Sequence, residues 1–256
     1  MTSILHGNFV WYELVSTDAP AARRFYGDVL GWDARDSQIP GIDYHVMGIG
    51  GTDIAGSMQL MDGMQPGWTG YIAVDDVKDA AEKALAAGAT TIVPVNPIPG
   101  VGHFSILLDP QGACFALVQY AADFSRKPTS LPEKGLQGHG WWRELRTTGD
   151  AEQAFAFYHQ QFGWPEVHRM PMPPDGFYLV FGDGMGIGGM FKDSSIEAPQ
   201  WMYYFWVDDI DATQAKLEKA GGKVMNGPHE VPGGTWVINA LDPQGVAFSL
   251  VGYRGK

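Results

Sequence analysis

The stretch that decides the fold runs from Asp18 to Trp32, DAPAARRFYGDVLGW, and its pattern returns from Asp150 to Trp164, DAEQAFAFYHQQFGW. In each copy an aspartate that can cap a helix precedes an apolar stripe at helical spacing, and a Gly-Trp pair follows. Glycine tolerates the left-handed conformation that commonly ends a helix. Both stretches therefore predict a capped amphipathic helix, which stops at Gly31 in the first copy and at Gly163 in the second.

The rest of the chain repeats in the same order. The other matching segments are WYEL at 11–14 with WREL at 142–145, VDD at 74–76 with VDD at 207–209, and DPQG at 109–112 with DPQG at 242–245. The offset between the copies stays between 131 and 133 residues over the whole half. Ordered matches at a nearly fixed offset predict two homologous domains, residues 1–120 and 139–256, joined by a linker at residues 121–138.

Each half contains a strand, a helix and three strands, followed by the same set again. The strands are short runs rich in aromatic and β-branched residues, and a second helix is predicted near residues 77–87 and 210–220. This order predicts an α+β class, in which two tandem domains each contain two βαβββ modules. Because the helices cover one sheet face only, we expect the other face to curl into a cup.

Composition excludes several classes of partner. The 256 residues carry 17 basic and 29 acidic side chains, a net charge of −12, so phosphate backbones and anionic lipids are poor partners. The single cysteine, Cys114, allows no intrachain disulfide, and the sequence shows neither a secretory signal nor an apolar run that spans a membrane. We therefore expect a cytoplasmic protein with a small-molecule ligand, as a monomer with an internal pseudo-dimer or as a homodimer.

The motifs resemble those of the vicinal oxygen chelate superfamily, which includes glyoxalase I, extradiol dioxygenases and bleomycin-resistance proteins. The resemblance rests on the Phe-Tyr and Gly-Trp pairs of the first helix, the VDD before the second helix and the DPQG before the last strand. More closely, the chain resembles tandem glyoxalase-like proteins of bacteria that are often named hydroxylases. The resemblance implies a cup-shaped site and, in metal-dependent members, one divalent ion held by His, Glu or Gln.

The positions that this resemblance assigns to metal ligands carry the wrong side chains. They are Trp11 and Trp142, Gln59 and Met190 or Phe191, Thr69 and Met202, and Ala116 and Ser249. Of these side chains only Gln59 has the chemistry to ligate, and it would be alone, because an indole N–H offers a metal no lone pair and alanine offers nothing. The sequence therefore predicts that the usual metal site is missing from both halves. No cofactor is expected from the residues, and a divalent metal is implied by the resemblance alone.

A polar pair remains in the expected cup. Glu13 follows Trp11 by two residues and Glu144 follows Trp142 by two, so each pair shares one strand face. A carboxylate removed from water holds its proton more readily, which suits a general acid or base, although a buried structural glutamate is the alternative. His103, whose counterpart is Trp236, is a further candidate for proton transfer or a strand-edge residue.

The candidate ligand-binding side chains come from the same strands. They are Trp11, Trp142, Tyr44, His45, Gln59 and Trp236. His45 has the apolar counterpart Leu179, which predicts that at most one half has a working polar site. Packing between the halves is the alternative role for the tryptophans.

Three hypotheses remain open. The first is a glyoxalase-like enzyme acting on a small carbonyl, hydroxylated or aromatic compound, in which Glu13 or Glu144 transfers a proton. The second is a non-catalytic protein of the bleomycin-resistance type that sequesters a planar small molecule. The third is an assembly platform, which would require a filled cup.

Overall fold

The structure is a computed structural model and describes the chain except for residues 1–2, 40, 127, 129–134, 175 and 256. Several residues of the linker predicted at 121–138 therefore lie outside the described part. Within that part, no helix has the length and apolar character needed to cross a membrane.

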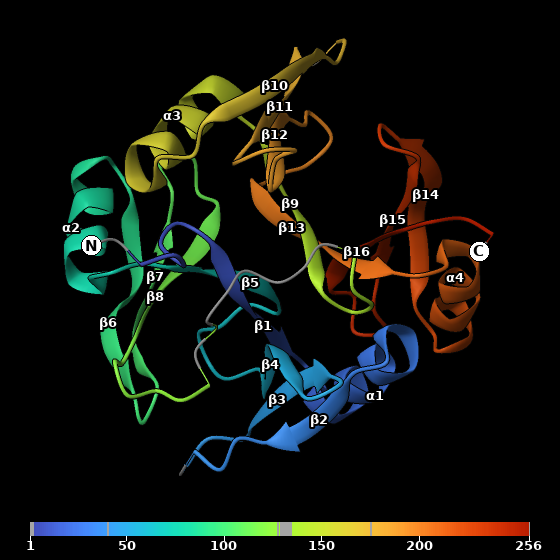
Figure 1. Cartoon of the computed structure of the whole chain (residues 1–256), viewed down its shortest axis with the longest axis horizontal. Helices are drawn as coiled ribbons and strands as arrows, with labels where there is room; N and C mark the ends of the chain where they lie inside the picture. Colours follow the sequence, from blue (N-terminus) through green and yellow to red (C-terminus); the bar gives the residue numbers. More distant parts are fainter. Residues whose placement is uncertain (1–2, 40, 127, 129–134, 175, 256) are drawn as a thin grey trace. The chain divides into compact units, whose positions relative to one another are not determined.

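The described residues of the first half form eight strands and two helices (Figure 1). They are β1 (Phe9–Ser16), α1 (Ala19–Leu30), β2 (Asp33–Asp36), β3 (Tyr44–Ile49), β4 (Thr52–Gln59), β5 (Gly67–Ala73), α2 (Val77–Ala86), β6 (Thr90–Ile98), β7 (Gly102–Leu108) and β8 (Cys114–Tyr120).

The second half repeats this order. Its elements are β9 (Gly140–Thr147), α3 (Ala151–Phe162), β10 (Glu166–Pro171), β11 (Phe177–Phe181), β12 (Gly188–Lys192), β13 (Gln200–Val207), α4 (Ile210–Lys219), β14 (Lys223–Val231), β15 (Thr235–Leu241) and β16 (Ala247–Gly252).

Each half forms one curled eight-stranded sheet. The strand orders are β2-β3-β4-β1-β5-β8-β7-β6 and β10-β11-β12-β9-β13-β16-β15-β14. Within each module the first strand pairs in parallel with the last, as β1 does with β4 and β5 with β8, and the remaining pairs are antiparallel. The predicted α+β class and the two tandem glyoxalase-like domains are confirmed.

The helix caps form as their sequences predict. The Asp18 side chain accepts a hydrogen bond from the Ala21 N–H at 2.9 Å, and Asp150 accepts one from the Glu152 N–H at 2.9 Å. Gly31 and Gly163 end α1 and α3 in the left-handed conformation, at φ of 78° and 71°. Local aspartate caps and left-handed glycines thus mark both ends of these helices.

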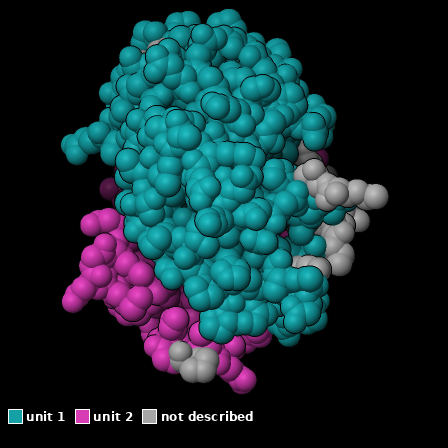
Figure 2. Space-filling model, turned by 90° about the vertical axis from the view of Figure 1, so that its left-hand side faces the viewer, with its two compact units in different colours: residues 1–10, 69–131, 142–201 teal, residues 11–68, 132–141, 202–256 magenta. Residues whose placement is uncertain are grey.

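The chain packs as two compact units that each combine modules from both halves (Figure 2). Unit 1 comprises residues 1–10, 69–131 and 142–201, and unit 2 comprises residues 11–68, 132–141 and 202–256. Helix α1 of the first half thus lies in unit 2 with the DPQG turn at 242–245 of the second half, and α3 lies in unit 1 with the DPQG turn at 109–112.

A buried tyrosine links the two modules inside each unit. In unit 2 the Tyr26 hydroxyl donates to Asp242 Oδ2 at 3.2 Å and accepts from the Trp68 indole N–H at 3.0 Å. In unit 1, Tyr158 donates to Asp109 Oδ2 at 3.1 Å and accepts from the Trp201 indole at 3.0 Å. The tyrosine of the Phe-Tyr motif thus meets the aspartate of the DPQG turn from the other half.

Each of these aspartates also organises its own turn. Asp109 Oδ1 accepts from the backbone N–H groups of Gln111 and Ala113, both at 2.9 Å, and Asp242 makes the equivalent pair of bonds. Burial raises the pKa of Asp109 and of Asp242 above the ordinary aspartate value, although the hydrogen bonds that each accepts oppose this shift. Burial, and then the neighbouring Asp242 carboxylate, hold the pKa of Tyr26 well above its usual value.

Removing either tyrosine hydroxyl should destabilise the fold. We expect Tyr26→Phe and Tyr158→Phe each to lower the free energy of unfolding by about 1–3 kcal/mol, because a buried indole N–H loses its acceptor and a buried carboxyl loses a donor. Urea denaturation measures the change. Tyr120→Phe is the control, since in the described part of the chain that hydroxyl makes no hydrogen bond, and we expect a loss below about 0.5 kcal/mol. Equal losses in all three variants would contradict this account.

The buried aspartates also predict a pH dependence. A folded pKa above the unfolded value of about 3.9 means that the folded state keeps its proton over the window between the two values. The contribution of each aspartate to stability should therefore fall as pH rises through that window and stay constant above it. Urea denaturation of the wild type and of Asp109→Asn at several pH values from about 4 upward should show the wild type losing stability relative to the variant. Asp33→Asn changes an exposed aspartate and is the control, so its difference in stability from the wild type should not change with pH. The same pH-independent difference for Asp109→Asn would refute the prediction.

Candidate active site

The two faces of strand β9 both carry polar side chains. Arg143, Leu145 and Thr147 are buried on one face. Trp142, Glu144 and Arg146 alternate with them and therefore share the other face. The glutamate is 8% exposed, whereas its two neighbours on this face are half-buried. A charged side chain is thus nearly removed from water beside groups that a ligand can reach.

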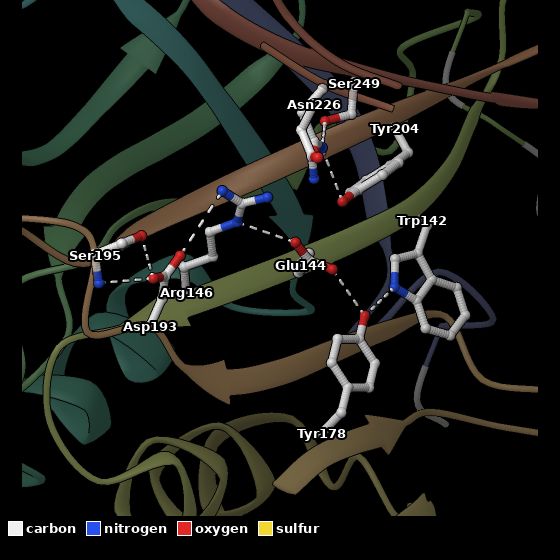
Figure 3. Close-up of polar contacts among 10 residues, drawn as sticks. Trp142, Glu144, Arg146, Tyr178, Asp193, Ser195, Tyr204, Asn226 and Ser249 are labelled. Carbon is white, nitrogen blue, oxygen red and sulfur yellow. Dashed lines mark hydrogen bonds and ion pairs between the residues drawn. The ribbon is translucent and has the colours of Figure 1, made fainter. Parts of the chain in front are cut away.

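Glu144 is held at both oxygens (Figure 3). The Tyr178 hydroxyl donates to Oε2 at 3.0 Å, and Arg146 Nε donates to Oε1 at 3.1 Å. The Trp142 indole N–H in turn donates to the Tyr178 oxygen at 2.8 Å. The indole, the phenol and the carboxylate therefore form a directed chain of donors that ends on Glu144.

Arg146 is positioned from its other side. Its guanidinium lies 3.9 Å from Asp193 and 5.9 Å from the centre of the Phe191 ring. Asp193 itself accepts hydrogen bonds from the N–H and the hydroxyl of Ser195, at 2.9 and 2.5 Å. The arginine thus bridges two carboxylates while its side chain remains partly exposed.

A glycine allows Tyr178 to reach Glu144. Gly189 on β12 pairs directly with Glu144 in the sheet, and the Tyr178 ring lies across it. A Cβ at this position would overlap the ring atoms, so any side chain here would displace the tyrosine. The Trp142–Tyr178–Glu144 chain therefore depends on a residue without a side chain.

The first half builds a related arrangement within unit 2. The Trp11 indole donates to the Tyr44 hydroxyl at 2.9 Å, and a Cβ on Gly56 would overlap the Tyr44 ring. Gly56 pairs with Glu13, which is half-buried. The position equivalent to Arg146 holds Val15, so the first half lacks a guanidinium there.

A second polar row crosses four strands of unit 2. The Asn239 side chain donates to the Tyr204 hydroxyl at 3.1 Å and to the Ser249 hydroxyl at 2.7 Å (Figure 3). The Asn226 side chain donates to the Asn239 oxygen at 3.4 Å. The equivalent positions in the first half hold Tyr71, Ala116, Ile106 and Val93, so this row belongs to the second half alone.

The other sequence-predicted residues lie outside these clusters. In the described structure His103 is exposed and makes no hydrogen bond or ion pair. His45 lies 3.1 Å from Asp43, and its side chain faces away from Tyr44 because adjacent strand residues alternate. Trp236 lies under the Arg254 guanidinium at 4.5 Å. Their proposed roles in proton transfer or ligand binding stay predictions.

Gln59 has a structural task at the start of α1. Its side-chain oxygen accepts from the Ala19 N–H at 3.1 Å, and its nitrogen donates to the Thr17 carbonyl at 2.7 Å. Both ends of the amide are thus engaged by the backbone, and a role in ligand binding stays a prediction.

The residues present do not fit the divalent metal that the superfamily implies. The indoles at the first ligand position use their N–H groups as donors to tyrosine oxygens. Across the described residues, no group of three or more His, Cys, Asp or Glu side chains could hold an ion. The donor set therefore provides no metal centre of the familiar kind, and we derive no chemical step through one.

Sequence reasoning missed Tyr178, Arg146 and Asp193. The signal for Tyr178 was present, because the alignment of His45 with Leu179 also pairs Tyr44 with Tyr178. Arg146 lies two residues after Glu144 and therefore shares its face, which alternation could have shown. Asp193 follows β12 in a loop, and its contact with Arg146 has no signature in the sequence.

The glycine requirement can be tested by Gly189→Ala. We expect the added methyl group to displace the Tyr178 ring and to break its bonds to Trp142 and Glu144, at a cost in stability. The indole N–H resonance of Trp142, assigned with Trp142→Phe, should shift in the same direction as in Tyr178→Phe. In a Tyr178→Ala background the clash is gone, so Gly189→Ala should cost much less free energy of unfolding. An unshifted indole resonance, or the same cost in both backgrounds, would show that the ring does not lie over Gly189.

Comparisons of the sequence with known families and proteins agree on its kinship. Residues 145–250 match the Glyoxalase/Bleomycin resistance protein/Dioxygenase superfamily, and residues 12–118 match the Glyoxalase-like domain. The chain is 32% identical over 248 residues to "Putative glyoxylase CFP32" of Mycobacterium tuberculosis, covering 94% of this chain and 93% of that one. It is 27% identical over 272 residues to "Anthracycline biosynthesis protein DauV" of Streptomyces sp. (strain C5), covering 99% and 96%.

Solved structures share the fold at low identity. A Mn(II)-bound glyoxalase from Novosphingobium aromaticivorans superposes with a TM-score of 0.70 at 13% identity, covering 100% of this chain and 84% of that one. The 2,3-dioxygenase LapB from Pseudomonas sp. KL28 gives a TM-score of 0.69 at 14% identity, covering 100% and 94%. The Mycobacterium tuberculosis relative is 32% identical over 94% of this chain, and a family model matches each half. The chain therefore belongs to the Glyoxalase/Bleomycin resistance protein/Dioxygenase superfamily, also known as the vicinal oxygen chelate superfamily.

Proposed function

We propose that this protein is a glyoxalase-like enzyme that moves a proton between neighbouring carbons of a small carbonyl, hydroxylated or aromatic compound. The observation that carries the proposal is the nearly buried Glu144 carboxylate, which lies between the Tyr178 hydroxyl and the Arg146 guanidinium. The relatives named as a glyoxylase and as an anthracycline biosynthesis protein support a small-molecule role. The single cysteine, which permits no intrachain disulfide, is compatible with the cytoplasmic location that we propose.

The residues supply a base and a stabilising charge. Glu144 removes a proton from a hydroxyl-bearing carbon beside a carbonyl group, and the electron pair moves onto the carbonyl oxygen to give an enediolate. The Arg146 guanidinium stabilises that negative charge, since a fixed cation in a partly dry site favours a charged intermediate. Glu144 then delivers the proton to the former carbonyl carbon, and the hydroxyl proton of the first carbon passes to the oxygen of the second. The first carbon thereby becomes the carbonyl, and no oxidant or reductant is consumed.

A non-catalytic binding protein is the second candidate. Both oxygens of Glu144 already accept hydrogen bonds in the structure, which also fits a rigid polar wall that recognises a ligand without reacting. The half-buried rings of Trp142 and Tyr178 would then contribute contact area.

The two candidates separate in Glu144→Gln. If Glu144 is the base, this variant should bind the ligand with wild-type affinity and lose about 10²–10⁴-fold in kcat. The assay uses the hemithioacetal of methylglyoxal and glutathione together with a panel of hydroxylated aromatic carbonyl compounds, and tryptophan fluorescence reports binding. The matched control is Glu13→Gln in the first half, where the native Val15 occupies the position equivalent to Arg146. The kcat of this variant should stay within about threefold of the wild type.

Further measurements bear on the chemistry itself. In D₂O the product should gain deuterium at the carbon that receives the proton. Turnover that persists in Glu144→Gln would refute the base, and turnover that requires added Ni²⁺, Zn²⁺ or Fe²⁺ would refute a reaction carried by these residues. Tight binding with no turnover of any compound would favour the sequestering protein.

A further inference from the structure

A cavity of about 310 Å³ opens in unit 2, near the start of helix α4. It is lined by Gly135, Trp206, Asp208, Asp209 and Tyr253. We call it the Trp206 cavity. It contains none of the side chains that surround Glu144, which are Trp142, Arg146, Tyr178 and Asp193. Its volume is sufficient for a small organic molecule.

Aromatic rings form the apolar part of the Trp206 cavity. The Trp206 ring lies 4.6 Å from the Trp141 ring and 5.2 Å from the edge-on Tyr253 ring, measured between centres. Gly135 adopts a φ of 81° beside Trp206, and a Cβ there would lie 3.7 Å from the indole. The backbone at Gly135 thus passes close to the indole of Trp206, which is 4% exposed, whereas Tyr253 is 37% exposed.

The polar part of the cavity is negative. Asp208 is exposed, and in the described structure its carboxylate makes no hydrogen bond or ion pair, while its backbone N–H donates to Gln137 at 2.9 Å. Asp209 caps α4 through one oxygen, which accepts from the N–H groups of Asp211 and Ala212 at 3.0 and 3.1 Å.

The cation next to Tyr253 in the sequence is engaged elsewhere. Arg254 Nε donates to Asp211 at 2.9 Å, and the guanidinium stacks over Trp236. The chain as a whole carries a net charge of −12. The field at the cavity therefore favours a positive ligand.

In the first half, the residues equivalent to those of the Trp206 cavity are engaged with other groups or differ in type. Asp75, the counterpart of Asp208, accepts from the Ser3 N–H at 3.0 Å and lies 3.4 Å from His6. Alanine 73 stands where the second half has Trp206, and Tyr120, the counterpart of Tyr253, stacks on Phe124 at 5.6 Å. Among the described residues, the second copy combines a cavity lined by aromatic rings with an exposed carboxylate that makes no ion pair, and the first copy does not.

We propose that the Trp206 cavity binds a small organic cation with an alkylated ammonium group. Such a group is attracted to aromatic faces and to a carboxylate, and its methyl groups shed water easily. A metal ion would instead need several oxygen ligands around it, which indole and phenol rings do not supply.

A matched pair of probes tests the charge. Choline and its neutral isostere 3,3-dimethyl-1-butanol have nearly the same shape and differ in charge. We expect calorimetric titration of the whole protein to show choline binding at least about tenfold more tightly at equal ionic strength. Equal affinity of the two probes, or no choline binding at millimolar concentration, would overturn the proposal.

Three variants locate the site. Asp208→Asn keeps the backbone bond to Gln137 and should weaken choline binding about three- to tenfold, as should Tyr253→Leu, which removes one ring. The control Asp75→Asn changes the equivalent position of the first half and should bind choline like the wild type. Unchanged binding in both Asp208→Asn and Tyr253→Leu would place the cation elsewhere and refute the site. This titration measures no turnover, so its failure and a failure of the proposed reaction are distinguishable.

Discussion

The hydrogen bond from a buried helix tyrosine to the aspartate of a DPQG turn is the interaction on which the fold depends. Asp242 would be costly to bury alone, because a carboxylate removed from water must recover hydrogen bonds inside the protein. Two backbone N–H groups of its own turn and the Tyr26 hydroxyl provide them. The tyrosine and the turn come from different halves, so neither half can complete this arrangement inside its own modules. The bond therefore joins the two modules that each compact unit draws from different halves.

Most of the fold could be predicted from the sequence because its signals are local. Asp18 and Gly31 mark the ends of α1 through their own side-chain and backbone geometry, and the distant Gln59 adds one hydrogen bond at its start. Strands with one buried face were also found, since alternation marks them. The ranges of β2 (Asp33–Asp36) and β10 (Glu166–Pro171) were not predicted, because these edge strands are almost entirely exposed and carry no alternation. The meeting of the Tyr158 hydroxyl with Asp109 was equally out of reach, since a contact across 49 positions leaves no trace in periodicity.

The sequence predicted the candidate site only in part, because contacts between distant residues leave no local pattern. Period-two spacing placed Glu144 beside Trp142, and the structure shows them linked through Tyr178. Whether Glu144 has a hydrogen-bond partner depends on residues of other strands. Here Tyr178 reaches it because Gly189 has no side chain. Gly189 matters through the space that it leaves for a ring, which composition and motif searches do not register. His45 was grouped with Tyr44 although adjacent strand residues point to opposite faces, and its role in ligand binding stays a prediction.

The two halves keep one scaffold and differ in the side chains that the scaffold presents. The capping aspartates, the Tyr–Asp bonds and the paired glycines beneath Tyr44 and Tyr178 occur in both copies. Arg146 faces Glu144 where Val15 stands in the first half, and Asn239 and Ser249 stand where Ile106 and Ala116 do. Each of these changes replaces an apolar group by a hydrogen-bonding one on a strand whose backbone pairing is already fixed. Such positions can change chemically without disturbing the buried bonds between modules. The features that both halves share therefore carry stability, and the proposed function rests on polar side chains that the second half alone presents at these positions.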